Sequence, residues 1–178
     1  MTTYINPPEK LLPWLCHETS LTEKLKECTG EASLHVLGHV SLIPGHWERN
    51  VLGIQDQMEF VREIVMYSGE TRCWYARTIV AQSIYEANRD FFSRVEQNGL
   101  SVVLFHEKCA NRLSLDCYSI SKKDIDFSWV TSLLSPLYTS QELDQLSLWV
   151  RRSSYSIAPK SHFYLVEIFL PDFLDLIV

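Results

Sequence analysis

The chain has 178 residues, of which 46% are hydrophobic and 21% are charged, and its formal net charge is −6. A chain of this length buries enough surface to form one domain without disulfides or metal, and its composition excludes a disordered or collagen-like protein. The acidic balance argues against a non-specific nucleic-acid binder, which needs a basic surface.

The N-terminal residues and the cysteines indicate a cellular compartment. Met1 to Lys10 lack a basic region followed by an apolar stretch, so we find no secretory signal. No apolar run reaches the roughly 18 residues that a membrane helix requires. The five cysteines are an odd number without a C-x-x-C pair, a pattern typical of reduced thiols. We therefore expect a cytoplasmic protein without membrane insertion.

The first predicted elements are helices. Pro7 to Cys16 favours a short helix. Ser20-x-x-Glu23 is a capping box, which predicts a helix over Leu21–Cys28, and Gly30 stands where a glycine would end it.

Most of the other apolar segments have the pattern of strands. Ser68-Gly69 separates two of them as a hairpin turn would. Because several strands follow one another with few helices between them, we predict an α+β fold, an antiparallel sheet with helices packed on one face. The predicted strands are Ala32–Ile43, Glu59–Tyr67, Thr71–Val80, Leu100–Lys108, Arg112–Ser119, Arg152–Ile157 and His162–Leu170.

Two further capping boxes predict helices later in the chain. One starts at Ser83 and the other at Thr139. The least patterned segment, Ser121–Ser140, is typical of an extended loop or an insertion. We expect a single domain over residues 1–178 with an insertion around residues 121–145. The apolar stripe that follows Ser83 consists of Ile84, Ala87, Phe91, Phe92 and Val95, ahead of Gly99.

Three charged residues interrupt apolar faces of the predicted strands. Side chains alternate between the two faces of a strand, so Arg62 shares a face with Ile64. Glu167 has apolar neighbours on both faces of its strand, and Arg77 lies in a similar apolar row. An unpaired buried charge costs several kcal/mol, roughly, so each of these groups needs a partner.

Arg62 and Glu167 therefore have two explanations. From the residues alone the simpler one is structural: the two pair with each other or with nearby polar groups. The other is a cavity between the sheet and the helices, in which Arg62 binds a ligand carboxylate and Glu167 receives a hydroxyl. Arginine suits this role because its planar guanidinium can hold a carboxylate through two hydrogen bonds.

Other motifs point to no site. His35 and His39 share a strand face two steps apart, but no carboxylate or cysteine completes a metal-ligand set with them or with His46. Cys16-His17 and the neighbourhood of Cys109 do not indicate a thiol nucleophile, because sequence neighbours rarely have the required geometry. The chain contains no G-x-S-x-G, P-loop or G-x-G-x-x-G motif.

An ordered set of short stretches resembles the bacterial chorismate pyruvate-lyase family. The stretches cover most of the chain and occur in the family's order. They are Thr19-Ser20-Leu21-Thr22, Val61-Arg62-Glu63-Ile64, Ala76-Arg77-Thr78-Ile79-Val80, Leu100 through Leu104-Phe105, Leu148-Trp149-Val150-Arg151-Arg152-Ser153, and Leu165-Val166-Glu167-Ile168-Phe169-Leu170-Pro171.

The resemblance implies a six-stranded antiparallel sheet with an occluded internal site. It implies a lyase that converts chorismate to 4-hydroxybenzoate and pyruvate, the first step of ubiquinone synthesis, without metal or cofactor. In such enzymes an arginine binds the ring carboxylate, a position that falls on Arg62. Two backbone amides assist, at Leu21 and Leu100, and a glutamate that falls on Glu167 faces the ring hydroxyl. Arg62 and Glu167, two of the three residues that strand alternation singles out, match the two positions that the family uses, which favours the functional explanation.

The chain departs from the family pattern mainly at Ser101-Val102, where a Gly-Arg pair is usual, and in the additional segment around Ser121–Gln145. A non-catalytic protein that binds an aromatic carboxylate on the same fold is the alternative function. It would resemble the ligand-binding domains of some bacterial regulators, although too few residues precede Ser20 for a helix-turn-helix domain. A third hypothesis is an interaction protein that acts through the insertion. We expect small-molecule partners, no nucleic acid, and a monomer, since no coiled coil or exposed apolar helix is evident.

Overall fold

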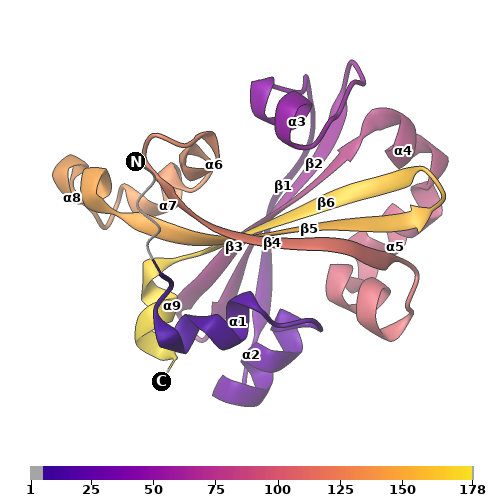
Figure 1. Ribbon diagram of the computed structural model, residues 1–178. Coiled ribbons are helices and arrows are strands. Elements are labelled where there is room, and N and C mark those ends of the chain that lie inside the picture. The colour runs from indigo at the N-terminus through magenta and orange to yellow at the C-terminus, as the bar shows by residue number, and fades with distance from the viewer. Residues whose placement is uncertain (1–5, 178) are drawn as a thin grey trace.

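A computed structural model describes residues 6–177 and has one antiparallel sheet at its centre (Figure 1). The six strands are hydrogen-bonded in the order β1-β2-β3-β6-β5-β4. The six-stranded antiparallel sheet is therefore confirmed. The strands are β1 (Ser33–Leu42), β2 (Glu59–Ser68), β3 (Thr71–Ala81), β4 (Asn111–Ser121), β5 (Ser147–Ala158) and β6 (Ser161–Phe169).

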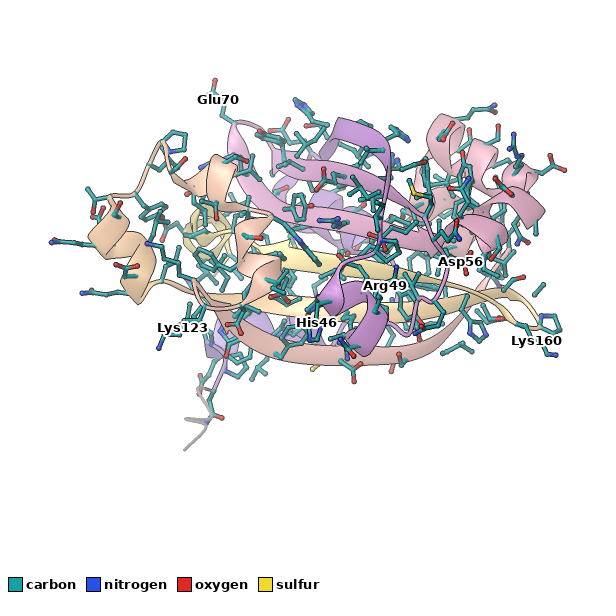
Figure 2. The ribbon with its side chains drawn as sticks, turned by 90° about the horizontal axis from the view of Figure 1, so that it is seen from above. His46, Arg49, Asp56, Glu70, Lys123 and Lys160 are labelled. Carbon is teal, nitrogen blue, oxygen red and sulfur yellow. The ribbon has the colours of Figure 1, made fainter. Side chains whose placement is uncertain are left out.

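Short turns join two of the paired sets of strands, β2 with β3 and β5 with β6. The predicted hairpin between β2 and β3 is present, and Gly69 adopts a left-handed conformation there, with φ of 57°, which glycine adopts without steric cost. The turns that carry Glu70 and Lys160 lie at opposite ends of the sheet (Figure 2).

The helices are short and lie before, between and after the strands. The predicted cap of α2 is present, since the Glu23 amide donates to Ser20 Oγ at 3.1 Å. The capping box at Thr139 is also present, at the start of α8. The helices are η1 (Glu9–Leu11), α1 (Leu12–Leu15), α2 (Leu21–Thr29), α3 (His46–Val51), α4 (Gln82–Ala87), α5 (Arg89–Asn98), η2 (Val102–His106), α6 (Ile125–Ser128), α7 (Thr131–Leu134), α8 (Ser140–Gln145) and α9 (Pro171–Leu176).

The prediction of a strand over Leu100–Lys108 is wrong. This segment contains η2, a π-helical turn in which the Glu107 amide donates to the Val102 carbonyl at 3.0 Å. Gly99 precedes it with φ of 84° and ψ of 151°, a conformation essentially restricted to glycine. The chain therefore turns at Gly99 and buries Val103 and Leu104 by coiling rather than by joining the sheet.

The capping box predicted at Ser83 is also absent. Helix α4 begins at Gln82, and the Ser83 amide donates to Asp56 Oδ2 at 2.9 Å, from a loop that precedes β2. The predicted apolar stripe is divided between α4 and α5 because the chain leaves helical geometry at Asn88. Phe91, Phe92 and Val95 of α5 are nevertheless buried as the stripe requires.

The helices cover both faces of the sheet, not the single face that the sequence predicted (Figure 1). Helices α3, α6, α7 and α8 lie over one face, where Val61, Val65 and Val166 of the strands are fully buried. Figure 2 looks down on this face, with α3 and its residues His46 and Arg49 across the strands. Helices α1, α2, α5 and α9 and the turn η2 cover the opposite face.

Residues 122–146 do not form the extended loop that the sequence predicted. They contain the short helices α6, α7 and α8, whose side chains Phe127, Val130 and Leu134 are buried against the sheet. The segment is thus part of the hydrophobic core, and its status as an insertion stays a prediction. Within residues 6–177, no helix has the length and apolar character that crossing a bilayer would need.

Candidate active site

A cavity of about 280 Å³ lies between the sheet and the segments that cover its second face. Side chains of β2, β3, β6, β5 and β4 form its floor, and residues of α2 and of the 98–106 segment cover it. Its size is near the lower end of the roughly 300–1,000 Å³ typical of small-molecule sites. Most of the lining is apolar, including Ile64, Trp74 and Leu165.

Strand pairing places the charged residues of the cavity in adjacent rows on one face of the sheet. Glu167 is one row along the strands from Arg62 and two strands across, because β3 lies between β2 and β6. One row consists of Ile64, Ala76, Glu167 and Arg151, and the next of Arg62, Thr78, Leu165 and Ser153.

Arg62 is a buried cation that pairs with no carboxylate in the part of the chain that the structure describes. Its side chain is 4% exposed, and its Nε has no hydrogen-bond acceptor among residues 6–177. No described carboxylate lies within ion-pair distance of its guanidinium. Burial lowers the pKa of Arg62, since removal from water disfavours its charge. The structural explanation that Arg62 pairs with Glu167 therefore does not hold.

Glu167 is paired instead with Arg151. The Arg151 Nε lies 3.4 Å from Glu167 Oε2. Its two Nη atoms donate to the Trp14 and His17 carbonyls at 2.8 and 2.9 Å, which fixes the guanidinium in place. Burial raises the pKa of Glu167, while the charges of Arg151 and Arg112 act in the opposite direction.

Leu21 and Leu100, the two predicted backbone contacts, both line the cavity from its covering segments. Leu21 is the first residue of α2, so its amide has no acceptor within the helix. Leu100 follows the turn at Gly99. The two segments are joined by a hydrogen bond of 2.5 Å between Ser20 Oγ and Ser101 Oγ, and by a second between His106 and Glu23.

Two arginines of the cavity, Arg151 and Arg112, are not evident from the strand patterns of the sequence. Arg151 lies just before the predicted strand Arg152–Ile157, whereas β5 begins five residues before that strand, at Ser147. Extension of the alternation through Trp149 would have placed Arg151 on the same face as Ser153. No sequence signal locates Arg112, because an irregularity of β4 decides its face.

Arg77, His35, His39 and His46 lie away from this cavity, whereas His106 is among the residues that line it. Arg77 is on the opposite face, 4.0 Å from Glu48 and 3.9 Å from Glu63, with its guanidinium over the Trp129 ring. Within residues 6–177, no three or more His, Cys, Asp or Glu side chains gather where they could hold a metal ion.

The cavity suits a flat ring with an anionic group at one end and a hydroxyl at the other. The free guanidinium of Arg62 can bind a carboxylate through two hydrogen bonds. The carboxyl of Glu167 can exchange a hydrogen bond with a hydroxyl, and the apolar side chains between them can contact the ring. Exclusion of water strengthens each of these polar interactions.

The chain is similar to several bacterial proteins. A relative in Aromatoleum aromaticum, named "Probable chorismate pyruvate-lyase", is 24% identical over 95% of this chain and 89% of its own length. One in Shewanella sp. (strain W3-18-1), with the same name, is 29% identical over 93% of this chain and 82% of its own. One in Idiomarina loihiensis, also so named, is 32% identical over 56% of this chain and 54% of its own.

Solved structures share the fold at low sequence identity. A GntR-family transcriptional regulator from Bacillus cereus has a TM-score of 0.57 and 10% identity, over 80% of this chain and 93% of its own. PhnF from Mycobacterium smegmatis has a TM-score of 0.53 and 12% identity, over 88% of this chain and 66% of its own. The family model described as chorismate lyase matches residues 2–176. Together with the relatives, that match over nearly the whole sequence shows that the chain belongs to the chorismate lyase family.

Proposed function

We propose that the protein is a lyase that converts chorismate to 4-hydroxybenzoate and pyruvate. The observation that carries the proposal is that two buried, opposite charges, Arg62 and Glu167, lie on one face of the sheet in one cavity. Among residues 6–177 no carboxylate neutralises Arg62, so an anionic ligand would stabilise it.

In this proposal, Arg62 binds the ring carboxylate and the amides of Leu21 and Leu100 assist. Glu167 hydrogen-bonds the ring hydroxyl, and burial raises its pKa, which favours a role in proton exchange with the substrate. The carbon–oxygen bond to the enolpyruvyl group breaks and the neighbouring carbinol carbon loses its proton. The ring becomes aromatic and the released enol becomes pyruvate.

The driving force of this reaction lies in the substrate, because the product ring is aromatic. The protein has to hold the side chain of the substrate in a reactive conformer and exclude water. The apolar lining and the two covering segments support that role. The reaction so written needs no metal or cofactor, and we place it in the cytoplasm, in a monomer, as a supply of 4-hydroxybenzoate for ubiquinone synthesis.

The test is incubation of the purified protein with chorismate, with pyruvate and 4-hydroxybenzoate measured together. The wild type should release both in equal amounts. Because charge-assisted hydrogen bonds to a buried ligand are lost, Arg62→Ala and Glu167→Ala should each lower kcat/KM by about 100-fold or more. The matched control is Arg152→Ala, since Arg152 lies next to Arg151 on β5 but pairs with Asp116 at 3.1 Å, away from the cavity.

Two other outcomes are informative. No product from the wild type would refute the lyase. Tight binding of 4-hydroxybenzoate without turnover would indicate the alternative, a protein that binds aromatic carboxylates on the same fold.

A further inference from the structure

Besides Arg62, one other arginine of the cavity has no carboxylate within ion-pair distance among the described residues. This is Arg112 of β4, which is half-buried and lines the cavity. The charge of Arg151 is balanced by Glu167, at 3.4 Å. The floor of the cavity therefore has two uncompensated positive charges, Arg62 and Arg112.

The partners of Arg112 are all neutral. Its Nε and Nη2 donate to the Tyr155 hydroxyl at 3.2 and 3.0 Å, and its Nη1 donates to the Glu18 carbonyl at 2.9 Å. A guanidinium has five N–H groups, so these three bonds leave two N–H groups for a ligand. Tyr155 is itself 2% exposed, which holds Arg112 against a rigid neighbour.

An extra residue in β4 turns Arg112 toward the cavity. Leu115 pairs with Ser153, so regular alternation would place Leu113 opposite Tyr155. The register shifts between Arg112 and Ser114, and Arg112 takes that place while Leu113 is 55% exposed. Bulges of this kind commonly redirect a side chain beside a functional site.

The order of the strands places the three charged groups in sequence. Arg62 is on β2, Glu167 is two strands further along on β6, and Arg112 is two strands beyond that on β4. Along the strands, Arg112 lies in the row of Tyr155 and Phe163, one row past that of Arg62 and two rows from that of Glu167. A ring that extends from Arg62 to Glu167 therefore has Arg112 to one side of its hydroxyl end. The positive charge of Arg112 opposes the burial that raises the pKa values of Glu167 and Tyr155, as expected for a cation close to both.

We propose that Arg112 binds the second carboxylate of a dianionic substrate, the one carried by the ether-linked side chain. The inference rests on the proposed function, because chorismate has a ring carboxylate and an enolpyruvyl carboxylate, whereas 4-hydroxybenzoate has only the first. Arg112 thus favours substrate over aromatic product, while Arg62 binds both.

A matched pair of unreactive ligands tests this assignment. The dianion is 3-(carboxymethoxy)-4-hydroxybenzoate and the monoanion is 4-hydroxy-3-methoxybenzoate, and Kd is measured for each by titration calorimetry. In Arg112→Gln the Kd of the dianion should rise about 10- to 100-fold, the range expected for one charge-assisted contact, while that of the monoanion stays within about twofold. Arg112→Lys should retain part of the preference, and Arg152→Gln should change neither Kd.

Each outcome supports or overturns the assignment of Arg112 to the second carboxylate. Retained binding of the monoanion shows that Arg112→Gln is folded, so a selective loss of the dianion supports the proposal. Equal weakening of both ligands, or no weakening of the dianion, would overturn it. If the ligands behave as expected but the wild type does not turn over chorismate, the proposed catalysis fails while the second carboxylate site stands. If the wild type binds neither ligand, both proposals fail.

Discussion

Glu59 and Glu167 are both buried carboxylates, but they lie on opposite faces of the sheet and have different neighbours. Glu167 has an arginine at 3.4 Å. Glu59 is 1% exposed, and its Oε2 has no hydrogen-bond partner among residues 6–177. Burial and the negative charge of Glu48 together raise the pKa of Glu59 from 4.5 to about 7, against the opposing charge of Arg77.

The raised pKa of Glu59 predicts how stability depends on pH. A carboxyl group whose pKa is higher in the folded protein than in the unfolded chain stabilises the fold while it is protonated. Its contribution is therefore complete below about pH 4.5 and is lost as the pH rises through 7. In urea unfolding, the free energy of unfolding of Glu59→Gln should increase relative to that of the wild type as the pH is raised from 5 to 8. A constant difference between the two proteins across this range would contradict the prediction.

The ion pair of Arg151 and Glu167 predicts how stability changes when one or both of its charges are removed. Arg151→Met leaves Glu167 without its cation and frees the Trp14 and His17 carbonyls, so the free energy of unfolding should fall by about 3–5 kcal/mol. Arg151→Met combined with Glu167→Gln should recover part of that loss, because no uncompensated charge then remains. Denaturant unfolding of the three variants checks this, and a double variant no more stable than Arg151→Met would refute the pairing.

At the scale of elements, strand alternation predicted more than helix signals did. It identified β2, β3 and β6 and singled out Arg62 and Glu167, which lie on one face of the sheet and line the same cavity. The run around Val102–Phe105 has the β-branched, apolar character of a buried strand, and only its packing under α5 and the turn at Gly99 make it helical. The start of α4 depended on Asp56, and the face of Arg112 on a bulge, neither of which is evident from local sequence.

The segments that cover the cavity allow a prediction about their contact. Ser20 caps α2 and also bonds Ser101, whereas Ser101 takes part only in that second interaction among the described side chains. Ser20→Ala should therefore lower the free energy of unfolding by about 1 kcal/mol through loss of the cap, and Ser101→Ala by clearly less. Thermal or urea unfolding of the two single variants measures the difference, and equal losses would mean that the cap contributes nothing.

At the scale of the whole molecule, the two faces of the sheet have separate roles. One contains the cavity, and the other forms the largest hydrophobic cluster, with α6, α7 and α8 packed on it. The helical segment between β4 and β5 therefore supports the fold from the side away from the candidate site.

This division predicts that stability and binding can be changed independently. Phe127 of α6 is 1% exposed, and Phe127→Ala should lower the free energy of unfolding by about 3–5 kcal/mol through the cavity it creates. The Kd for 4-hydroxybenzoate should stay within about twofold at temperatures where the variant is folded. Leu113→Ala, at an exposed position, is the control for stability. A large loss of affinity in Phe127→Ala would show that the two faces are coupled.

Because Arg62 and Glu63 point to opposite faces of the sheet, the length of β2 limits where genes of this family can gain or lose codons. One codon added to or removed from the middle of β2 would move every later side chain of that strand to the other face. The cavity and the opposite core would then be lost together. Gains and losses of residues among related chains should therefore accumulate at the turns near Glu70 and Lys160 and within residues 122–146, where no strand register has to be kept.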